Sequence, residues 1–201
     1  MRFPGDGVIE EPDLQTTHAL TIEAPAAAIW PWLVQIGQGR AGFYSDSRWW
    51  DAVVDAYYRL LSREQRCPPV RYERDGGRIV PEWQGRRVGD VIPDGPAGTA
   101  FYVVRAIQTE RNMVLFTNTH LPHMLPASVR GHVSAELTVD YLLVPVAPEH
   151  TRMLRRMRMA CRPAWFRWMA VPVVWFWGER ITARKFLRGL ARRAERSRRD
   201  A

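Results

Sequence analysis

The chain has 201 residues, of which 46% are hydrophobic and 25% charged, so it can form one α+β domain with a sizeable core and is too apolar for a disordered protein. The chain has 29 basic and 21 acidic residues. Residues 180–199 hold nine of the basic residues and one of the acidic ones, which leaves 20 basic and 20 acidic residues in the rest of the chain. The net charge of +8 therefore belongs to the C-terminal segment. The neutral body predicts no nucleic-acid partner, because such a partner needs a basic surface on the domain itself.

The N-terminal part of the chain predicts an arm, a strand and a helix. Residues 1–15 are expected to form an extended arm, and residues 16–201 a single domain. Apolar and polar side chains alternate over 18–23, which is typical of a strand. Pro25 suits the first turn of a helix over 26–36, because its missing N–H would have no partner there.

The middle of the chain predicts a second helix, a loop and a series of strands. Residues 46–62 have helical apolar spacing, and the polar residues 63–78 form a long loop or lid candidate. In 133–141 the odd positions are apolar and the even ones polar, so we expect one buried face and one face exposed to water. Antiparallel strands are expected near 88–93, 99–108, 111–120, 132–146 and 150–161.

A long C-terminal helix begins near residue 163, and its two halves differ. Residues 163–177 are strongly aromatic and apolar but too short for a membrane span. We favour a buried helix start that lies against the sheet and lines a cavity; the alternative is an aromatic, basic helix that touches a membrane surface through residues 163–199. In the second half, an arginine at every fourth position predicts a solvated face: Arg180, Arg184, Arg188, Arg192 and Arg196.

Three segments, in this order, carry a family resemblance. They are APAAAIWPWLVQIGQGRAGFYS at residues 24–45, IVPEWQ and VGD within residues 79–90, and RKFLRGLARRAE at residues 184–195. Together they resemble the START-like, or SRPBCC, superfamily, which includes polyketide cyclase/dehydrase-like proteins. The resemblance implies an α+β helix-grip fold, in which a curved antiparallel sheet wraps around a long C-terminal helix. It also implies a ligand cavity rather than one particular reaction.

The sequence motifs predict no cofactor and no metal site. The glycines of GQGRAG at 37–42 fit a dinucleotide fingerprint, but they follow a predicted helix and no βαβ unit surrounds them. His120 and His123 straddle Pro122 without a carboxylate nearby in sequence, so we expect no metal there. Cys67 and Cys161 lack metal-binding spacing and are expected to be reduced thiols. With no apolar signal segment at the N-terminus, we expect a cytoplasmic protein.

Strand parity singles out Arg155. It shares the inner face of the last strand with Met157, and a turn at 147–149 would place it opposite Tyr141. A cation on an apolar face is costly unless paired, so Arg155 is a candidate anchor for a carboxylate, enolate or phenolate. The alternatives are a bulge that turns Arg155 outward and an internal partner such as Glu82 or Asp90.

The leading interpretation is binding of a hydrophobic or aromatic small molecule, lipid-like or polyketide-like, in an internal cavity. A second is a polyketide cyclase or dehydratase in which Arg155 stabilises an enolate while His120 or Tyr141 moves a proton. A third is the membrane-surface adaptor. Catalytic activity and oligomeric state stay open at this level. The candidate ligand-binding residues are Trp30, Arg40, Tyr44, Glu82, Trp83, Tyr141, Arg155 and Met157.

Overall fold

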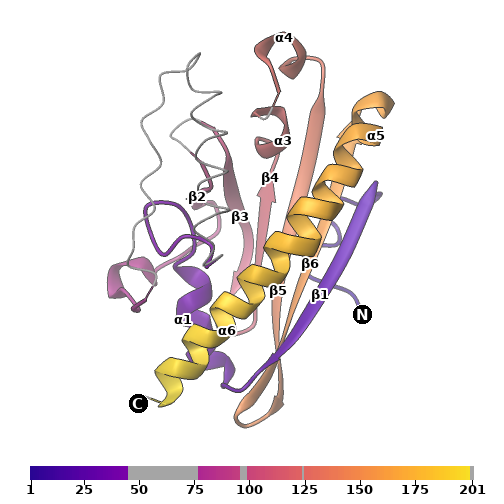
Figure 1. The fold of residues 1–201 in the computed structure, drawn as a ribbon. Coiled ribbons are helices and arrows are strands. Elements are labelled where there is room, and N and C mark those ends of the chain that lie inside the picture. The colour runs from indigo at the N-terminus through magenta and orange to yellow at the C-terminus, as the bar shows by residue number, and fades with distance from the viewer. Residues whose placement is uncertain (45–76, 96–98, 124, 200–201) are drawn as a thin grey trace.

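The computed structural model describes residues 1–44, 77–95, 99–123 and 125–199. These residues form a six-stranded antiparallel sheet with the strand order β1-β6-β5-β4-β3-β2, crossed on one face by the long C-terminal helix (Figure 1). The strands are β1 (Leu14–Ile22), β2 (Val91–Pro93), β3 (Phe101–Gln108), β4 (Asn112–Thr117), β5 (Ser134–Ala147) and β6 (His150–Arg162). The predicted α+β helix-grip fold is confirmed.

Helical segments flank this sheet. The long helix consists of α5 (Ala164–Val173), the π-helix η2 (Val174–Ala183) and α6 (Arg184–Arg199). Beside it lies α1 (Ala26–Val34), as Figure 1 shows. The short helices are the 3₁₀ turn η1 (Pro81–Trp83), α3 (His120–His123) and α4 (Ala127–Arg130). Among the described residues, no helix combines the length and the apolar character that crossing a membrane requires.

The strands expected from alternation coincide with β2 to β6 to within a few residues. β1 begins at Leu14, inside the segment expected to be an arm, and pairs along β6 through Ile22. The helix expected over 46–62 lies outside the described residues, as do residues 63–76 of the expected loop.

The N-terminal arm covers the outer face of the sheet, opposite the long helix. Phe3 is 3% exposed, and the guanidinium of Arg156 lies 3.9 Å from its ring centroid. Asp6 accepts hydrogen bonds from Arg156 at 2.9 Å and Arg158 at 3.2 Å. The expectation that this face of β5 is exposed to water is therefore wrong at its centre, where Asp140 is buried.

Asp140 holds the arm to the sheet. Its Oδ2 accepts a hydrogen bond from the backbone N–H of Gly5 at 2.7 Å, while Oδ1 has no hydrogen-bond partner in the described part of the chain. Burial raises the pKa of Asp140 from 3.8 to about 6; the Gly5 hydrogen bond opposes this, and the charge of Asp6 adds to it. The carboxyl group is therefore better accommodated when it is protonated.

The long helix packs on the inner face of the sheet through one apolar stripe. Its five expected members are all buried: Ala183, Phe186, Leu187, Leu190 and Ala194. The arginines at every fourth position are exposed, as predicted. The expectation of a buried helix start over 163–177 is wrong for one face. Phe166 and Ala170 face the sheet, but the side chains on the other side of α5 and η2 are exposed, because a single helix laid on a sheet buries only one face.

Gly189 allows the close approach of α6 to the loop after α1. A Cβ at this position would collide with the carbonyl oxygen of Tyr44 and lie 2.9 Å from the Tyr44 Cβ. Tyr44 is itself fixed, since it is buried and its hydroxyl donates a hydrogen bond to the Trp32 carbonyl oxygen at 2.7 Å.

We expect Gly189→Ala to lower the free energy of unfolding by about 2 kcal/mol, because backbone atoms must move to admit the methyl group. The control is Gly178→Ala on the same helix, where the added Cβ meets only Val174 Cγ1 at an ordinary 3.6 Å among the described residues. There the gain in helix propensity should stabilise by up to about 1 kcal/mol. Urea unfolding measures both variants, and equal effects would contradict the packing described for Gly189.

A second prediction concerns Asp140. Because its pKa is raised to about 6 in the folded protein, the stability that its protonated form contributes is complete below about pH 4 and is lost as the pH rises through 6. Asp140→Asn should therefore gain up to about 3 kcal/mol relative to the wild type between pH 4 and pH 7. Urea unfolding at a series of pH values measures this difference, and a constant difference would contradict the burial of an ionised Asp140.

Candidate functional site

Three polar side chains form a row across the inner face of the sheet. In the register of β1, β6 and β5, His18 pairs with Arg155 and Arg155 pairs with Tyr141. All three lie on the side that the long helix covers, because Arg155 and His18 reach its Glu179 and Tyr141 packs against its Phe186. The predicted inward orientation of Arg155 and its position opposite Tyr141 are confirmed, because the alternation of β6 continues without a bulge at this point.

The partner of Arg155 is Glu179, on the π-helix η2. Arg155 Nη1 donates to both carboxylate oxygens, at 2.9 Å to Oε1 and 2.8 Å to Oε2. The internal partners considered from the sequence are not used: Glu82 is exposed, and the carboxylate of Asp90 accepts the backbone N–H of Arg87 at 2.9 Å. An ion pair thus joins the centre of the sheet to the middle of the long helix.

The electrostatics of this pair keep both groups charged. Burial alone would raise the pKa of Glu179, but the charge of Arg155, the nearby His18 and hydrogen bonds from Thr16 and Arg155 lower it to about 2. Burial likewise opposes the charged form of Arg155, yet the Glu179 carboxylate raises its pKa above the usual value. The pair is therefore ionised at physiological pH and has no net charge.

Two residues of β1 complete the surroundings of the carboxylate. The hydroxyl of Thr16 donates to Glu179 Oε2 at 2.5 Å. Nε2 of His18 lies 3.4 Å from the same oxygen, and its geometry leaves it without a well-formed hydrogen bond among the described residues. Several polar groups thus surround Glu179 Oε2, and they stabilise the negative charge of the carboxylate.

Two phenols lie near the ion pair. Burial raises the pKa of Tyr141, while the charge of Arg155 and a hydrogen bond from it act in the opposite direction. Burial also raises the pKa of Tyr102 well above its ordinary value, and the charges of Asp94 and Glu179 add to this effect. Both phenols therefore stay neutral and can donate a hydrogen bond.

His120 is tied to its neighbours rather than free. Its Nδ1 is 2.8 Å from Thr117 Oγ1, and its Nε2 is 2.8 Å from Asp94 Oδ2. Its ring packs against Tyr102 with the centroids 4.3 Å apart. Sequence reasoning found no carboxylate for this histidine, because Asp94 precedes it by 26 residues and reaches it only through the pairing of β2 with β3.

The other candidate residues divide into core, loop and surface positions. Trp30, Tyr44 and Met157 are buried in the core, and Trp83 packs against it. Arg40 Nη1 donates to the Trp83 carbonyl oxygen at 3.3 Å and so links two loops. Glu82 is exposed on η1. Of the predicted ligand-binding set, Arg155 and Tyr141 contact one another beside Glu179. Sequence reasoning missed Glu179, Thr16, His18 and Tyr102, which surround this pair.

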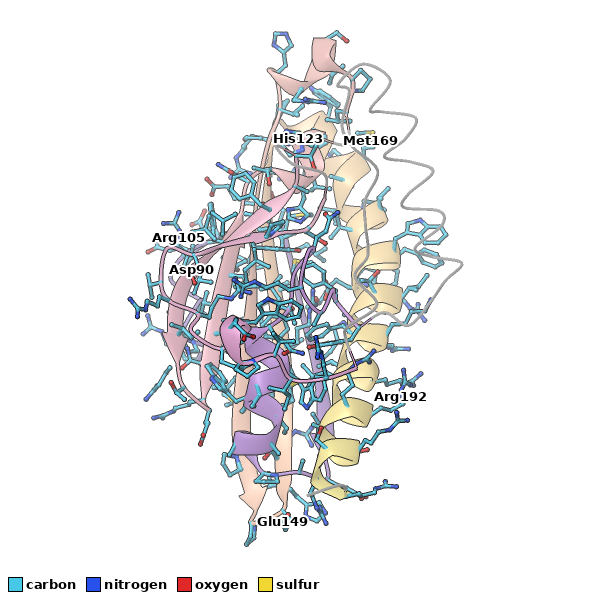
Figure 2. The ribbon with its side chains drawn as sticks, turned by 90° about the vertical axis from the view of Figure 1, so that its left-hand side faces the viewer. Asp90, Arg105, His123, Glu149, Met169 and Arg192 are labelled. Atoms are coloured by element: carbon cyan, nitrogen blue, oxygen red, sulfur yellow. The ribbon has the colours of Figure 1, made fainter. Side chains whose placement is uncertain are left out.

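His123 does not join His120 in a common site. Its Nδ1 contacts the backbone oxygen of Thr119 at 2.8 Å, and in Figure 2 it lies near the top of the molecule. Within the described ranges, no three His, Cys, Asp or Glu side chains are grouped so that they could hold a metal ion.

Sequence comparison and structure comparison give different results. No protein-family model matches the chain, and no curated protein matches its sequence. Among solved structures, a hypothetical protein from Helicobacter pylori matches with a TM-score of 0.50 at 11% identity, over 96% of this chain and 95% of that one. Norcoclaurine synthase from Thalictrum flavum matches with a TM-score of 0.46 at 13% identity, over 92% of this chain and 96% of that one. An aromatase/cyclase, ZhuI, from a Streptomyces species matches with a TM-score of 0.36 at 15% identity, over 91% of this chain and 94% of that one.

The strand order and the long C-terminal helix define the class: this is a protein with the helix-grip fold, which the Helicobacter pylori structure matches over nearly its whole length. The fold that the sequence resemblance implied is therefore confirmed.

The stability of the fold is expected to depend on the ion pair between Arg155 and Glu179. Glu179→Gln leaves Arg155 buried without a counter-charge and should lower the free energy of unfolding at pH 7 by about 3–5 kcal/mol. Because the pKa of Glu179 is lowered from 4.5 to about 2, its contribution is present above pH 4.5 and is lost as the pH falls toward 2. The difference between wild type and variant should shrink over that range in urea unfolding.

Glu195→Gln is the matched control, since Glu195 lies on the same helix and its Oε1 accepts an exposed backbone N–H, from Glu23 at 3.2 Å. The double variant Arg155→Met/Glu179→Leu should cost much less than the sum of its single variants. Additive single effects, or equal losses at positions 179 and 195, would show that the pair is not coupled.

Proposed function

We propose that the protein binds a neutral hydrophobic or aromatic small molecule between the sheet and the long helix, with one polar group of the ligand at the Arg155, Tyr141 and Tyr102 side chains. The observation that carries this proposal is a hydrogen-bonding cluster without net charge, set in an otherwise apolar interior. Such an arrangement is typical of small-molecule sites, in which apolar contact supplies affinity and a few polar groups set the orientation.

Tyr102 lies where the interior meets solvent. Burial raises the pKa of its hydroxyl well above the ordinary value, yet its side chain is only half-buried. This position suits a residue at the entrance to a ligand site. Rings of Phe43 and His120 pack beside Tyr102, with centroids 6.2 Å and 4.3 Å away.

The apolar surroundings suit an adaptable ligand site. Met153, Met157 and Met159 follow one another along the inner face of β6, on both sides of Arg155. Methionine side chains are flexible and polarisable, and they contact aromatic groups favourably. Phe186 of α6 closes the other side, with its ring centroid 5.2 Å from that of Tyr141.

Charge decides between ligand classes. An unpaired Arg155 would favour a carboxylate or a phenolate, as considered from the sequence. Because Glu179 already balances Arg155 and both phenols are neutral, an anionic ligand would have to displace Glu179 or be buried without a counter-charge. The cluster therefore favours a carbonyl or hydroxyl group on a neutral ligand.

The Asp94–His120 pair favours a second candidate function, a cyclase or dehydratase acting on a polyketide-like substrate. In such a reaction the Tyr102 or Tyr141 hydroxyl would donate a hydrogen bond to a carbonyl oxygen as negative charge develops on it. His120 would act on the substrate only after releasing Asp94 or Thr117, because both of its ring nitrogens have partners. Turnover of a polyketide-like substrate that His120→Gln abolishes, with binding retained, would favour this function over simple binding.

Two probes that differ only in charge test the proposed site. N-phenyl-1-naphthylamine is neutral, and 1-anilinonaphthalene-8-sulfonate is the same ring system with an anionic group. We expect fluorescence titration to show binding of the neutral probe and at least about tenfold weaker binding of the anionic one, because Arg155 is already balanced by Glu179. Native mass spectrometry of the protein as purified would reveal a co-purified ligand directly.

Tyr102→Phe and Tyr141→Phe should each weaken binding of a hydroxyl- or carbonyl-bearing ligand about three- to tenfold, because each variant removes one hydrogen bond to the ligand. Tyr44→Phe is the control, because it removes a hydroxyl that bonds to the Trp32 carbonyl oxygen instead. If neither probe binds and the mass is that of the bare chain, the binding proposal fails; if both probes bind equally, the preference for a neutral ligand fails.

A further inference from the structure

The outer side of α5 and η2 is an exposed aromatic face. Its members lie on the side of the helix that points away from Phe166 and Ala170, and Trp168 is 75% exposed. The other large apolar side chains exposed among the described residues are scattered over separate elements, whereas these follow one another along a single helix. We define the aromatic face as Trp165, Trp168, Met169, Val173, Trp175, Phe176 and Trp177.

Basic side chains continue the aromatic face along the same helix. Arg180 lies over the Trp175 ring, 5.3 Å from its centroid, and Arg184 and Arg188 follow as exposed side chains one turn apart. In Figure 2, Met169 of the aromatic half and Arg192 of the basic half lie along the same side of the molecule. The outer side of the long helix is thus aromatic in its first half and cationic in its second.

The acids of this helix do not neutralise that side. Between residues 163 and 199 the sequence contains only Glu179 and Glu195. Glu179 is buried against Arg155, and Glu195 accepts the backbone N–H of Glu23. The exposed side of the helix therefore combines aromatic rings with positive charge that the helix's own acids do not balance, which complements a surface that is apolar beneath an anionic layer.

We infer that the aromatic face docks on the surface of an anionic lipid bilayer. Tryptophan and phenylalanine side chains would enter the interfacial region, where amphipathic rings are favoured, and Arg180, Arg184 and Arg188 would contact lipid phosphates. The helix lies on the membrane in this arrangement, and its other side keeps its contacts with the sheet.

Co-sedimentation of the full chain with vesicles tests this inference. We expect little binding to phosphatidylcholine alone, and binding to phosphatidylcholine mixed with phosphatidylglycerol that weakens as salt is raised. Trp168→Ser/Phe176→Ser should weaken binding to the mixed vesicles about tenfold or more. Arg184→Gln and Arg188→Gln should each weaken it about fivefold.

Val88→Ser and Arg87→Gln are the matched controls, because they remove an exposed apolar and an exposed basic side chain from a loop that is not part of this helix. Both should bind like the wild type. Lack of binding by the intact chain, or binding that Trp168→Ser/Phe176→Ser leaves unchanged, overturns the inference. So does a dimer in sedimentation equilibrium that this variant converts to a monomer, because a second copy would then occupy the face.

Discussion

The ion pair between Arg155 and Glu179 is the interaction on which the position of the long helix over the sheet depends. It joins the middle of β6 to the middle of the helix inside an apolar interior, where neither group could remain charged alone. The apolar stripe of α6 can pack against the sheet in several neighbouring positions, since hydrophobic contact is not directional. A buried pair with both oxygens bonded to one guanidinium permits one position, and it also fixes which residues surround Tyr141 and Tyr102.

β6 connects the parts of the structure because its arginines alternate between two faces. Arg155 points inward to the C-terminal helix, while Arg156 and Arg158 point outward and hold Asp6 of the N-terminal arm. The two termini of the chain are thus tied to opposite faces of the same strand. This arrangement leaves the inner face without excess charge and explains how a chain with so many arginines encloses an apolar interior.

Alternation in the sequence predicted the sheet well because a strand has a period of two residues whatever its neighbours are. The same parity was sufficient to place Arg155 on the inner face opposite Tyr141. It failed at Asp140, whose burial depends on an arm more than a hundred residues away in sequence. The pairing of Asp94 with His120 was missed for the same reason, since a local pattern carries no information about which distant segment covers a residue.

Glu179 was missed for a geometric reason that also explains the aromatic face. It follows the buried Ala170 by nine residues, which in an uninterrupted α-helix is about two and a half turns, so Glu179 would point away from the sheet. The π-helix η2 has wider turns and rotates less per residue, which brings Glu179 back to the inner side. A lone acid between WFWG and RITARK was the available signal. Counted back four residues from the buried Ala183, it falls on the inner side of the helix, whereas counted forward from Ala170 it falls on the outer side, and the two halves come into phase only through η2. The same irregularity hides from sequence spacing that Trp175 and Phe176 face outward. One stretch of unusual helix therefore sets the buried ion pair and the part of the aromatic face that lies on η2.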